Sequence, residues 1–126
     1  NGIKDNVEYA ILTNAIYKEW SGMTASDYKD YKGIRKESLR DNMTDIEVVL
    51  TDLGEVATRE LAKEHKPYGL EENKKIAKRG GKIAKNTRDN LEKELGKSVI
   101  SKENALNYKY IDDKKLIEDK KSKKKK

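Results

Sequence analysis

Six cations between residues 75 and 88 are spaced so that one side of a helix could bind phosphate groups. Each lies three or four residues from another, a spacing that brings side chains together on a helix surface. Each charged group could contact one phosphate of a nucleic acid, and Gly80 and Gly81 would let backbone amides approach closely. The six candidate nucleic-acid-binding residues are Lys75, Lys78, Arg79, Lys82, Lys85 and Arg88.

The same stretch has a second interpretation, as an ordinary solvated surface. Glu71 and Glu72 precede the cations, and Asp89, Glu92 and Glu94 follow or interleave with them. Charged residues of both signs on a helix are typical of a face that contacts only water. The residues alone leave both interpretations open.

Other chemistry has little support in this sequence. The segment RGGK (79–82) lacks the glycine spacing of a phosphate-binding loop and the buried strand that precedes one. His65 is the single histidine and lies at the C-terminal end of a predicted helix. A histidine there commonly stabilises the helix dipole, and no neighbouring residue indicates general-base catalysis. With no cysteine and no carboxylate pair in apolar surroundings, we expect no enzyme activity, no metal and no cofactor.

Composition and charge indicate one small domain with an anionic or self-associating partner. The chain has 126 residues, 34% hydrophobic and 41% charged, with a net charge of +6. Residues 1–62 carry 8 Lys/Arg against 12 Asp/Glu, whereas residues 63–96 carry 10 against 6 and residues 97–126 carry 11 against 5. The N-terminal half of the chain is therefore acidic and the C-terminal half is basic. This asymmetry is typical of a protein that binds DNA, or of one in which the acidic half of one copy pairs with the basic half of another.

Helix periodicity and cap residues predict an all-α fold. We expect helices over 6–20, from Thr24 to Gly33, and over 44–67, with a turn or short helix at 36–44. Thr44 and Glu47 form a capping-box pattern, and Gly54 within the long helix indicates a close helix crossing or a kink.

The glycine pair at 80–81 predicts a break in the next helix. Two adjacent glycines cost a helix about 2 kcal/mol relative to alanine. We therefore expect a helix from Lys82 to Leu95, ended by Gly96, with a separate segment before it. In the repeat KIAK, which occurs at 75–78 and 82–85, we expect Ile and Ala to face the core while the cations face outward.

The ends of the chain have different expected roles. We predict a helical domain over 1–111 and a disordered Lys-rich tail over 112–126, which would either add phosphate affinity or only solubilise the chain. The segment 98–107 is ambiguous, with Val99 able to pack in an extended conformation. No apolar stretch suits a membrane span or a signal peptide, and a start without Met indicates a piece of a longer protein.

Tyrosine is the main aromatic residue, since the chain has seven Tyr, one Trp and no Phe. Exposed tyrosines could stack on the bases of a single strand. We expect them instead to form the aromatic part of the core. They are Tyr9, Tyr17, Tyr28, Tyr31, Tyr68, Tyr108 and Tyr110.

Two long segments resemble a known bacterial family. The stretches VEYAILTNAIYKEWSGMTASDYKDYKGI and LRDNMTDIEVVLTDLGEVATRELAK are similar to the C-terminal region of DNA-damage-inducible protein D. The resemblance covers roughly residues 7 to 100 and is cumulative, with no single decisive motif. The matching positions are Gly22, Thr24, Asp27, Lys32, Gly33, Leu39, Asp41, Met43, Thr44, Asn73, Gly81, Arg88, Leu91, Leu95 and Gly96.

That resemblance implies a cytoplasmic bacterial protein of the SOS response. Members of the family carry an N-terminal BRO-type domain, as phage antirepressors do, and this chain lacks it. The family implies modulation of a recombinase filament on DNA, without catalysis. Two hypotheses follow: a non-enzymatic domain that binds DNA or a DNA-bound recombinase, or an oligomerisation or protein-docking module of an antirepressor-like regulator with no direct DNA contact. Neither involves a membrane or a small-molecule substrate.

Overall fold

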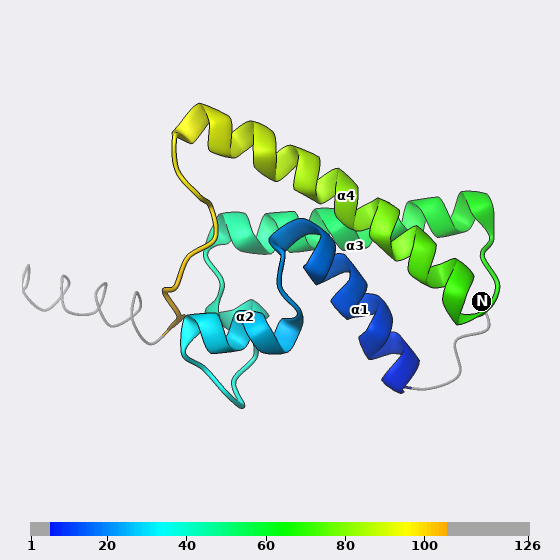
Figure 1. Ribbon diagram of the computed structural model, residues 1–126, viewed down its shortest axis with the longest axis horizontal. Coiled ribbons are helices and arrows are strands. Elements are labelled where there is room, and N and C mark those ends of the chain that lie inside the picture. Colours follow the sequence, from blue (N-terminus) through cyan, green and yellow to red (C-terminus); the bar gives the residue numbers. More distant parts are fainter. Residues whose placement is uncertain (1–5, 106–126) are drawn as a thin grey trace, which may run out of the picture.

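The computed structural model describes residues 6–105, which form four α-helices and contain no strand (Figure 1). The all-α prediction is therefore confirmed. The helices are α1 (Asn6–Ser21), α2 (Ala25–Lys32), α3 (Asp45–His65) and α4 (Gly69–Leu95), and a 3-10 turn, η1 (Arg40–Asn42), precedes α3. The predicted Lys-rich tail, Tyr108 and Tyr110 lie outside the described residues.

Local caps explain where α2 and α3 begin and end. The Thr24 hydroxyl accepts a hydrogen bond from the Asp27 amide at 3.2 Å, and Gly33 ends α2 with a positive φ of 74°. At the start of α3, Thr44 and Glu47 form the predicted capping box, each accepting from the backbone amide of the other. These contacts satisfy amides that a helix N-terminus would otherwise leave unpaired.

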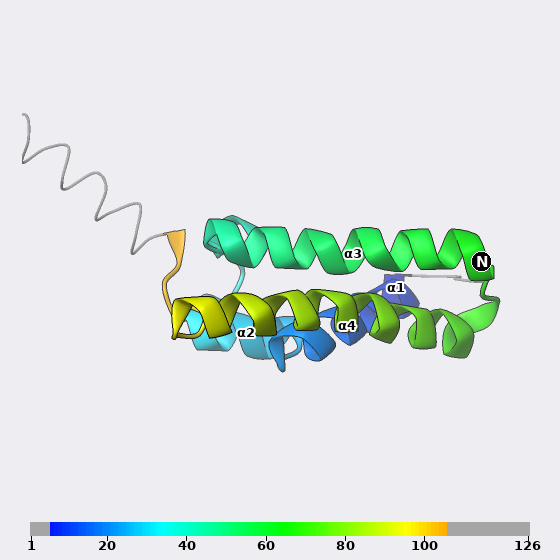
Figure 2. The same cartoon turned by 90° about the horizontal axis from the view of Figure 1, so that it is seen from above.

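Helices α3 and α4 run in opposite directions and are joined by a short turn at 66–68. They cross at an angle in Figure 1 and lie side by side in Figure 2. Helix α1 packs across the same pair, so that three helices meet near the middle of the molecule. The short α2 lies near the N-terminal end of α3, where it covers the end of the core (Figure 1).

Glycines permit the close approach of these three helices. A Cβ on Gly80 would lie 1.9 Å from Thr58 Oγ1 and 2.7 Å from the Thr58 backbone nitrogen. A Cβ on Gly81 would lie 2.7 Å from Glu19 Cβ, and one on Gly54 would lie 2.8 Å from the Ile16 side chain. The close crossing expected at Gly54 is confirmed.

The predicted helix break at residues 80–81 is wrong, because α4 is continuous from Gly69 to Leu95. The local prediction counted the helix propensity of two glycines and could not count the packing that they allow against α3 and α1. The predicted C-terminus was correct: Gly96 ends α4 with a φ of 73°, and its amide donates to the Glu92 carbonyl at 2.8 Å.

The core is built around aromatic residues from α1 and α2. Trp20 and Tyr28 are fully buried, and the Tyr28 ring meets Trp20 and Tyr17 edge to face with centroids 6.0 and 6.2 Å apart. The prediction of a tyrosine core therefore holds for Tyr17 and Tyr28. Three other tyrosines are exposed on the surface: Tyr9, Tyr31 and Tyr68.

A buried polar network fastens residues 98–105, the C-terminal strap, to α2 and α3. The Lys32 ammonium donates to Glu47 Oε1 at 2.7 Å and to the carbonyls of Ser101 and Glu103 at 2.8 and 2.7 Å. Tyr28 donates to the other Glu47 oxygen. Lys32 and Glu47 are both buried, so each charge relies on these partners in place of water.

Candidate nucleic-acid interface

All six predicted site residues lie on α4, but they divide into two groups by what they contact. The first group, Lys75, Lys78, Arg79 and Lys82, is exposed and forms no ion pair within residues 6–105. We call these four side chains the basic face. Because α4 is continuous, they stand on one rigid element and extend over about 10 Å of its length.

The charge of the basic face is not balanced along its own stretch of helix. Residues 73–88 contain no Asp or Glu, and Lys74, Lys85 and Arg88 accompany the four residues of the basic face there. Adjacent cations without acidic partners raise the local positive potential and attract an anion. The acidic residues that raised the solvated-surface alternative lie at the two ends of α4.

Lys85 already has an anionic partner. Its ammonium forms an ion pair with Asp89, one helical turn further on. A pair of this kind at i and i+4 stabilises an exposed helix by a few tenths of a kcal/mol. Lys85 must therefore exchange Asp89 for a phosphate before it could contribute to binding.

Arg88 supports the fold. Its guanidinium donates to the carbonyls of Trp20 and Ser21 at 3.0 and 3.3 Å and to Glu92 at 2.9 Å. It thereby satisfies carbonyls at the C-terminal end of α1, where a cation is also favoured by the helix dipole. Sequence reasoning missed this role because Arg88 and Trp20 are 68 residues apart in the chain.

Glu92 connects Arg88 to the C-terminal strap. Burial opposes its ionisation, but hydrogen bonds from Arg88 and from the Val99 amide outweigh that effect, and the pKa of the Glu92 carboxyl is lowered. The ionised carboxylate accepts from the Val99 amide at 2.9 Å. Val99 itself is buried, as expected from a packed extended segment.

A groove lies between α1 and α4, beside the basic face. Ile11 and Ala15 contribute apolar surface to it, whereas Lys74 and Lys78 from α4 contribute positive charge. Its volume is about 360 Å³. The other residues that line this α1–α4 groove are Asn14, Lys18, Glu19 and Thr24.

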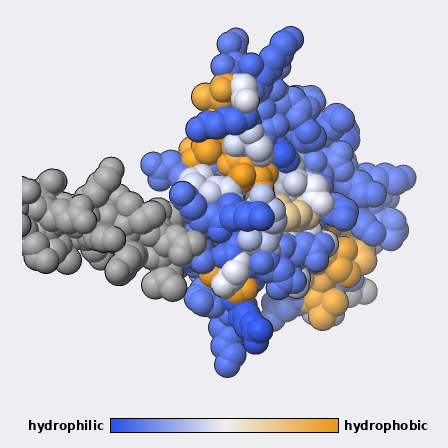
Figure 3. All heavy atoms as spheres, turned by 60° about the vertical axis from the view of Figure 1, so that its left-hand side comes forward, coloured by the Kyte–Doolittle hydropathy of each residue, from blue (hydrophilic) through white to orange (hydrophobic). Residues whose placement is uncertain are grey.

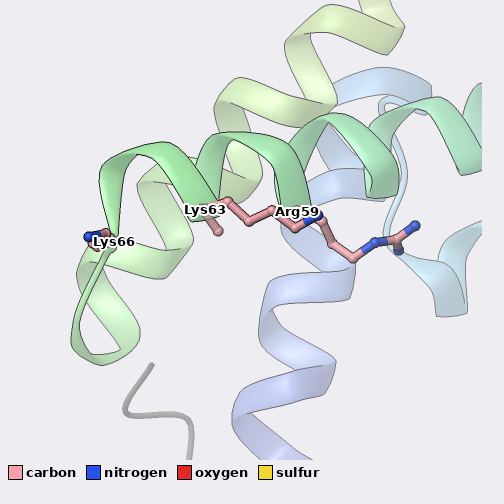
Figure 4. Close-up of a pocket in the computed structure, with 4 residues that line it drawn as sticks. Arg59, Lys63 and Lys66 are labelled. Atoms are coloured by element: carbon pink, nitrogen blue, oxygen red, sulfur yellow. The ribbon is translucent and has the colours of Figure 1, made fainter.

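A second basic hollow lies on the outer side of α3, lined by Arg59, Ala62, Lys63 and Lys66 (Figure 4). Its cations do not converge, because the Arg59 guanidinium points away from Lys66 (Figure 4). Lys63 forms an ion pair with Glu60 at 2.9 Å. This hollow is therefore a weaker candidate for binding an anion than the basic face.

The remaining sequence-based site predictions can also be placed. His65 is the last residue of α3 and is exposed. Ile76, Ala77 and Ala84 are buried as the KIAK repeat predicted, but Ile83 is 41% exposed, so only part of the second repeat packs into the core. Among residues 6–105, no three His, Asp or Glu side chains gather as metal ligands would.

Charged and polar side chains dominate the face of the molecule that Figure 3 shows. Figure 3 shows a mostly hydrophilic face on which hydrophobic side chains form separate small patches. None of the helices within residues 6–105 is long and apolar enough to cross a membrane.

The sequence matches no protein-family model, and no curated protein or solved structure is significantly similar to it.

Proposed function

We propose that this chain is a non-enzymatic DNA-binding domain that contacts phosphates through the basic face of α4. One observation carries the proposal: four exposed cations that form no ion pair within residues 6–105 stand on one continuous helix, in a stretch without acidic residues. Cations in this arrangement release the counterions of a nucleic acid when they bind it, and this release supplies affinity without sequence specificity.

The biological setting that we propose is the bacterial SOS response, in the cytoplasm, on DNA or on a DNA-bound recombinase. The support is the resemblance of residues 7 to 100 to DNA-damage-inducible protein D, together with the basic face. Because the basic face offers charges but no pocket with converging acid and base groups, it suits binding better than catalysis.

Fluorescence anisotropy with labelled DNA tests the proposal. We expect substitution of Lys75, Arg79 and Lys82 by Gln to weaken binding by about tenfold or more near physiological salt, since three phosphate contacts are lost. The matched control replaces Arg35, Lys36 and Lys97, which are also exposed and form no ion pair within the described chain. Equal affinity of the two variants would reject the basic face as the binding surface.

A protein-docking module is the second candidate, and the exposed apolar side chains of α3 favour it. Val49 and Val56 are 56% and 44% exposed and lie two turns apart on one side of the helix. In this alternative the domain associates with itself or with another protein and makes no DNA contact. Salt-sensitive self-association in sedimentation experiments, with no DNA affinity, would favour it over DNA binding.

A further inference from the structure

We propose that the α1–α4 groove receives an unpaired base, so that the domain prefers single-stranded over double-stranded nucleic acid. This inference rests on the proposed function, because it assumes that the basic face holds the phosphates. It adds a site for the base, lined mainly by residues of α1 and sharing Lys78 with the basic face.

The composition of the groove suits a base and its phosphate together. The partly exposed Ile11 offers apolar surface to the flat face of a base, while Ala15 is 9% exposed and only closes the floor of the groove. Lys18, Lys74 and Lys78 bring cations from both helices. Single-strand-binding proteins combine a positively charged track with aromatic side chains on which bases stack. In this groove the apolar contact with a base would come from Ile11 in place of an aromatic ring. The volume of about 360 Å³ leaves room for one base.

Lys78 connects the groove to the basic face. It lines the groove, and it also belongs to the four exposed cations on α4. A strand whose phosphates follow α4 therefore passes the edge of the groove and can turn one base into it. The bases of a duplex are paired and stacked, and one could enter only after it left the stack.

Asn14 supplies a donor for the edge of the base. Its side-chain oxygen accepts a hydrogen bond from the Ala25 amide at 2.9 Å, and only an oxygen can accept from that amide. The orientation of the Asn14 amide is therefore fixed, and its NH₂ group makes no hydrogen bond within the described residues. That group matches the carbonyl oxygens of a pyrimidine.

Among the described residues that line the groove, Glu19 is the acidic one, and its position limits where a phosphate can lie. It comes from α1 and stands close to Gly81, so it would repel a phosphate placed deep between the helices. A base carries no charge and avoids this repulsion. The groove therefore favours an arrangement with the base inside and its phosphates on the lysines outside.

Three labelled probes of equal length separate base contacts from phosphate contacts. They are a thymine single strand, a single strand of abasic sites, and a duplex. We expect the thymine strand to bind the full chain about fivefold or more tightly than the abasic strand, which carries the same phosphates but no bases. Equal binding of these two strands would overturn the groove as a base site, while binding of all three would leave the proposed function intact.

Substitution of Ile11 by Ala tests the groove itself. We expect the variant to lose most of the preference for thymine over abasic strand and to keep its affinity for the duplex. Val49→Ala is the matched control, because it removes an exposed apolar side chain from α3, outside the groove. Lys74→Gln gives a second variant that changes no apolar packing, and we expect it to weaken binding of both single strands.

Each outcome has a distinct meaning. An unchanged thymine-to-abasic ratio in Ile11→Ala, with native helix content by circular dichroism, would overturn the groove proposal alone. If Ile11→Ala fails to fold, an unchanged affinity of Lys74→Gln for both single strands would overturn it. Absence of binding to every probe by the unmodified chain would overturn both the groove and the basic face.

Discussion

Glu47 holds three parts of the molecule together through one buried carboxylate. Its Oε1 accepts from the Thr44 amide and from Lys32, and its Oε2 accepts from Tyr28 and from the Ser101 amide. The same residue therefore caps α3, anchors α2 and fixes the C-terminal strap. Removing one of these partners should destabilise the fold, because water cannot reach the buried carboxylate to replace the lost hydrogen bond.

Removal of Lys32 tests the importance of this network for stability. We expect Lys32→Met to lower the free energy of unfolding by about 3–5 kcal/mol, since it leaves the Glu47 charge buried without its cation. Urea unfolding followed by circular dichroism measures the change. The control is Lys29→Met on the same helix, which should change stability by no more than about 0.5 kcal/mol. Similar losses in the two variants would contradict the account.

The double variant Lys32→Met with Glu47→Gln separates the buried charge from simple loss of packing. We expect it to be more stable than Lys32→Met alone, because the unpaired charge is removed. If the second substitution lowered stability further by its full single effect, the charge of Glu47 would not be the cause.

The buried hydroxyl of Tyr28 should make the free energy of unfolding depend on pH in the alkaline range. Burial raises the pKa of its hydroxyl above the usual value near 10, and the hydrogen bond to Glu47 raises it further. The folded state therefore keeps a proton that the unfolded state loses, and stability present below pH 10 should fall as the pH rises above it. Burial, followed by the charge of Glu55, also raises the pKa of Tyr17, so both residues contribute.

Urea unfolding at pH 8 to 11, with tyrosinate absorbance, measures this dependence. We expect Tyr28→Phe to reduce the slope of stability against pH in the alkaline range and to leave the part due to Tyr17. An unchanged slope in Tyr28→Phe would contradict the assignment.

At the scale of the helices, Gly80 decides whether α4 can lie against α3. A methyl group there would meet the Thr58 backbone, which cannot move without shifting α3. The gain in helix propensity from Gly to Ala, about 1 kcal/mol, favours the substitution, but overpacking typically costs about 1–3 kcal/mol. Because the methyl group would meet backbone atoms, the overpacking cost at this site should lie at the upper end of that range and exceed the gain in helix propensity. We therefore expect Gly80→Ala to destabilise the protein.

Thermal unfolding of Gly80→Ala and of Asn86→Ala measures the balance. Asn86 is exposed on the same helix, so its substitution by Ala improves helix propensity without a clash. We expect a lower melting temperature for Gly80→Ala and an unchanged or higher one for Asn86→Ala. A stabilised Gly80→Ala would mean that the crossing is looser than described.

The helices also show which features a sequence can predict. Some residues act only on their near neighbours in the chain, and their pattern correctly predicted the start of α3 and the C-terminal ends of α2 and α4. These residues are Thr44, Glu47, Gly33 and Gly96. The continuity of α4 depends on contacts with α3 and α1, and the same glycines that indicated a break allow those contacts.

The sequence predicted which cations of α4 lie near one another, but it did not predict what each of them contacts. Helical spacing was enough to group the cations of α4, because it depends only on neighbours in the chain. It could not separate Arg88 from the basic face, since the carbonyls that Arg88 binds belong to the end of α1. The burial of Lys32 and Glu47 as a pair likewise depends on the folded chain, because the two residues are 15 positions apart in the sequence.

At the scale of the whole molecule, cations of the same residue type have different roles. Lys32 and Arg88 hold the fold, Lys85 pairs with a neighbour, and the basic face remains available to a partner. Net charge alone would attract DNA to any part of a basic chain. We propose instead that phosphates bind at one place, the basic face of α4.

The salt dependence of DNA binding distinguishes a binding face on α4 from general attraction by net charge. Each lost phosphate contact should reduce the slope of log affinity against log salt by about 0.9 for a duplex and about 0.7 for a single strand. We predict that the variant with Gln at Lys75, Arg79 and Lys82 reduces the slope by about 2 to 3, whereas the control with Gln at Arg35, Lys36 and Lys97 leaves it nearly unchanged. Equal slopes in the two variants would mean that only overall charge attracts DNA, and would contradict a binding face on α4.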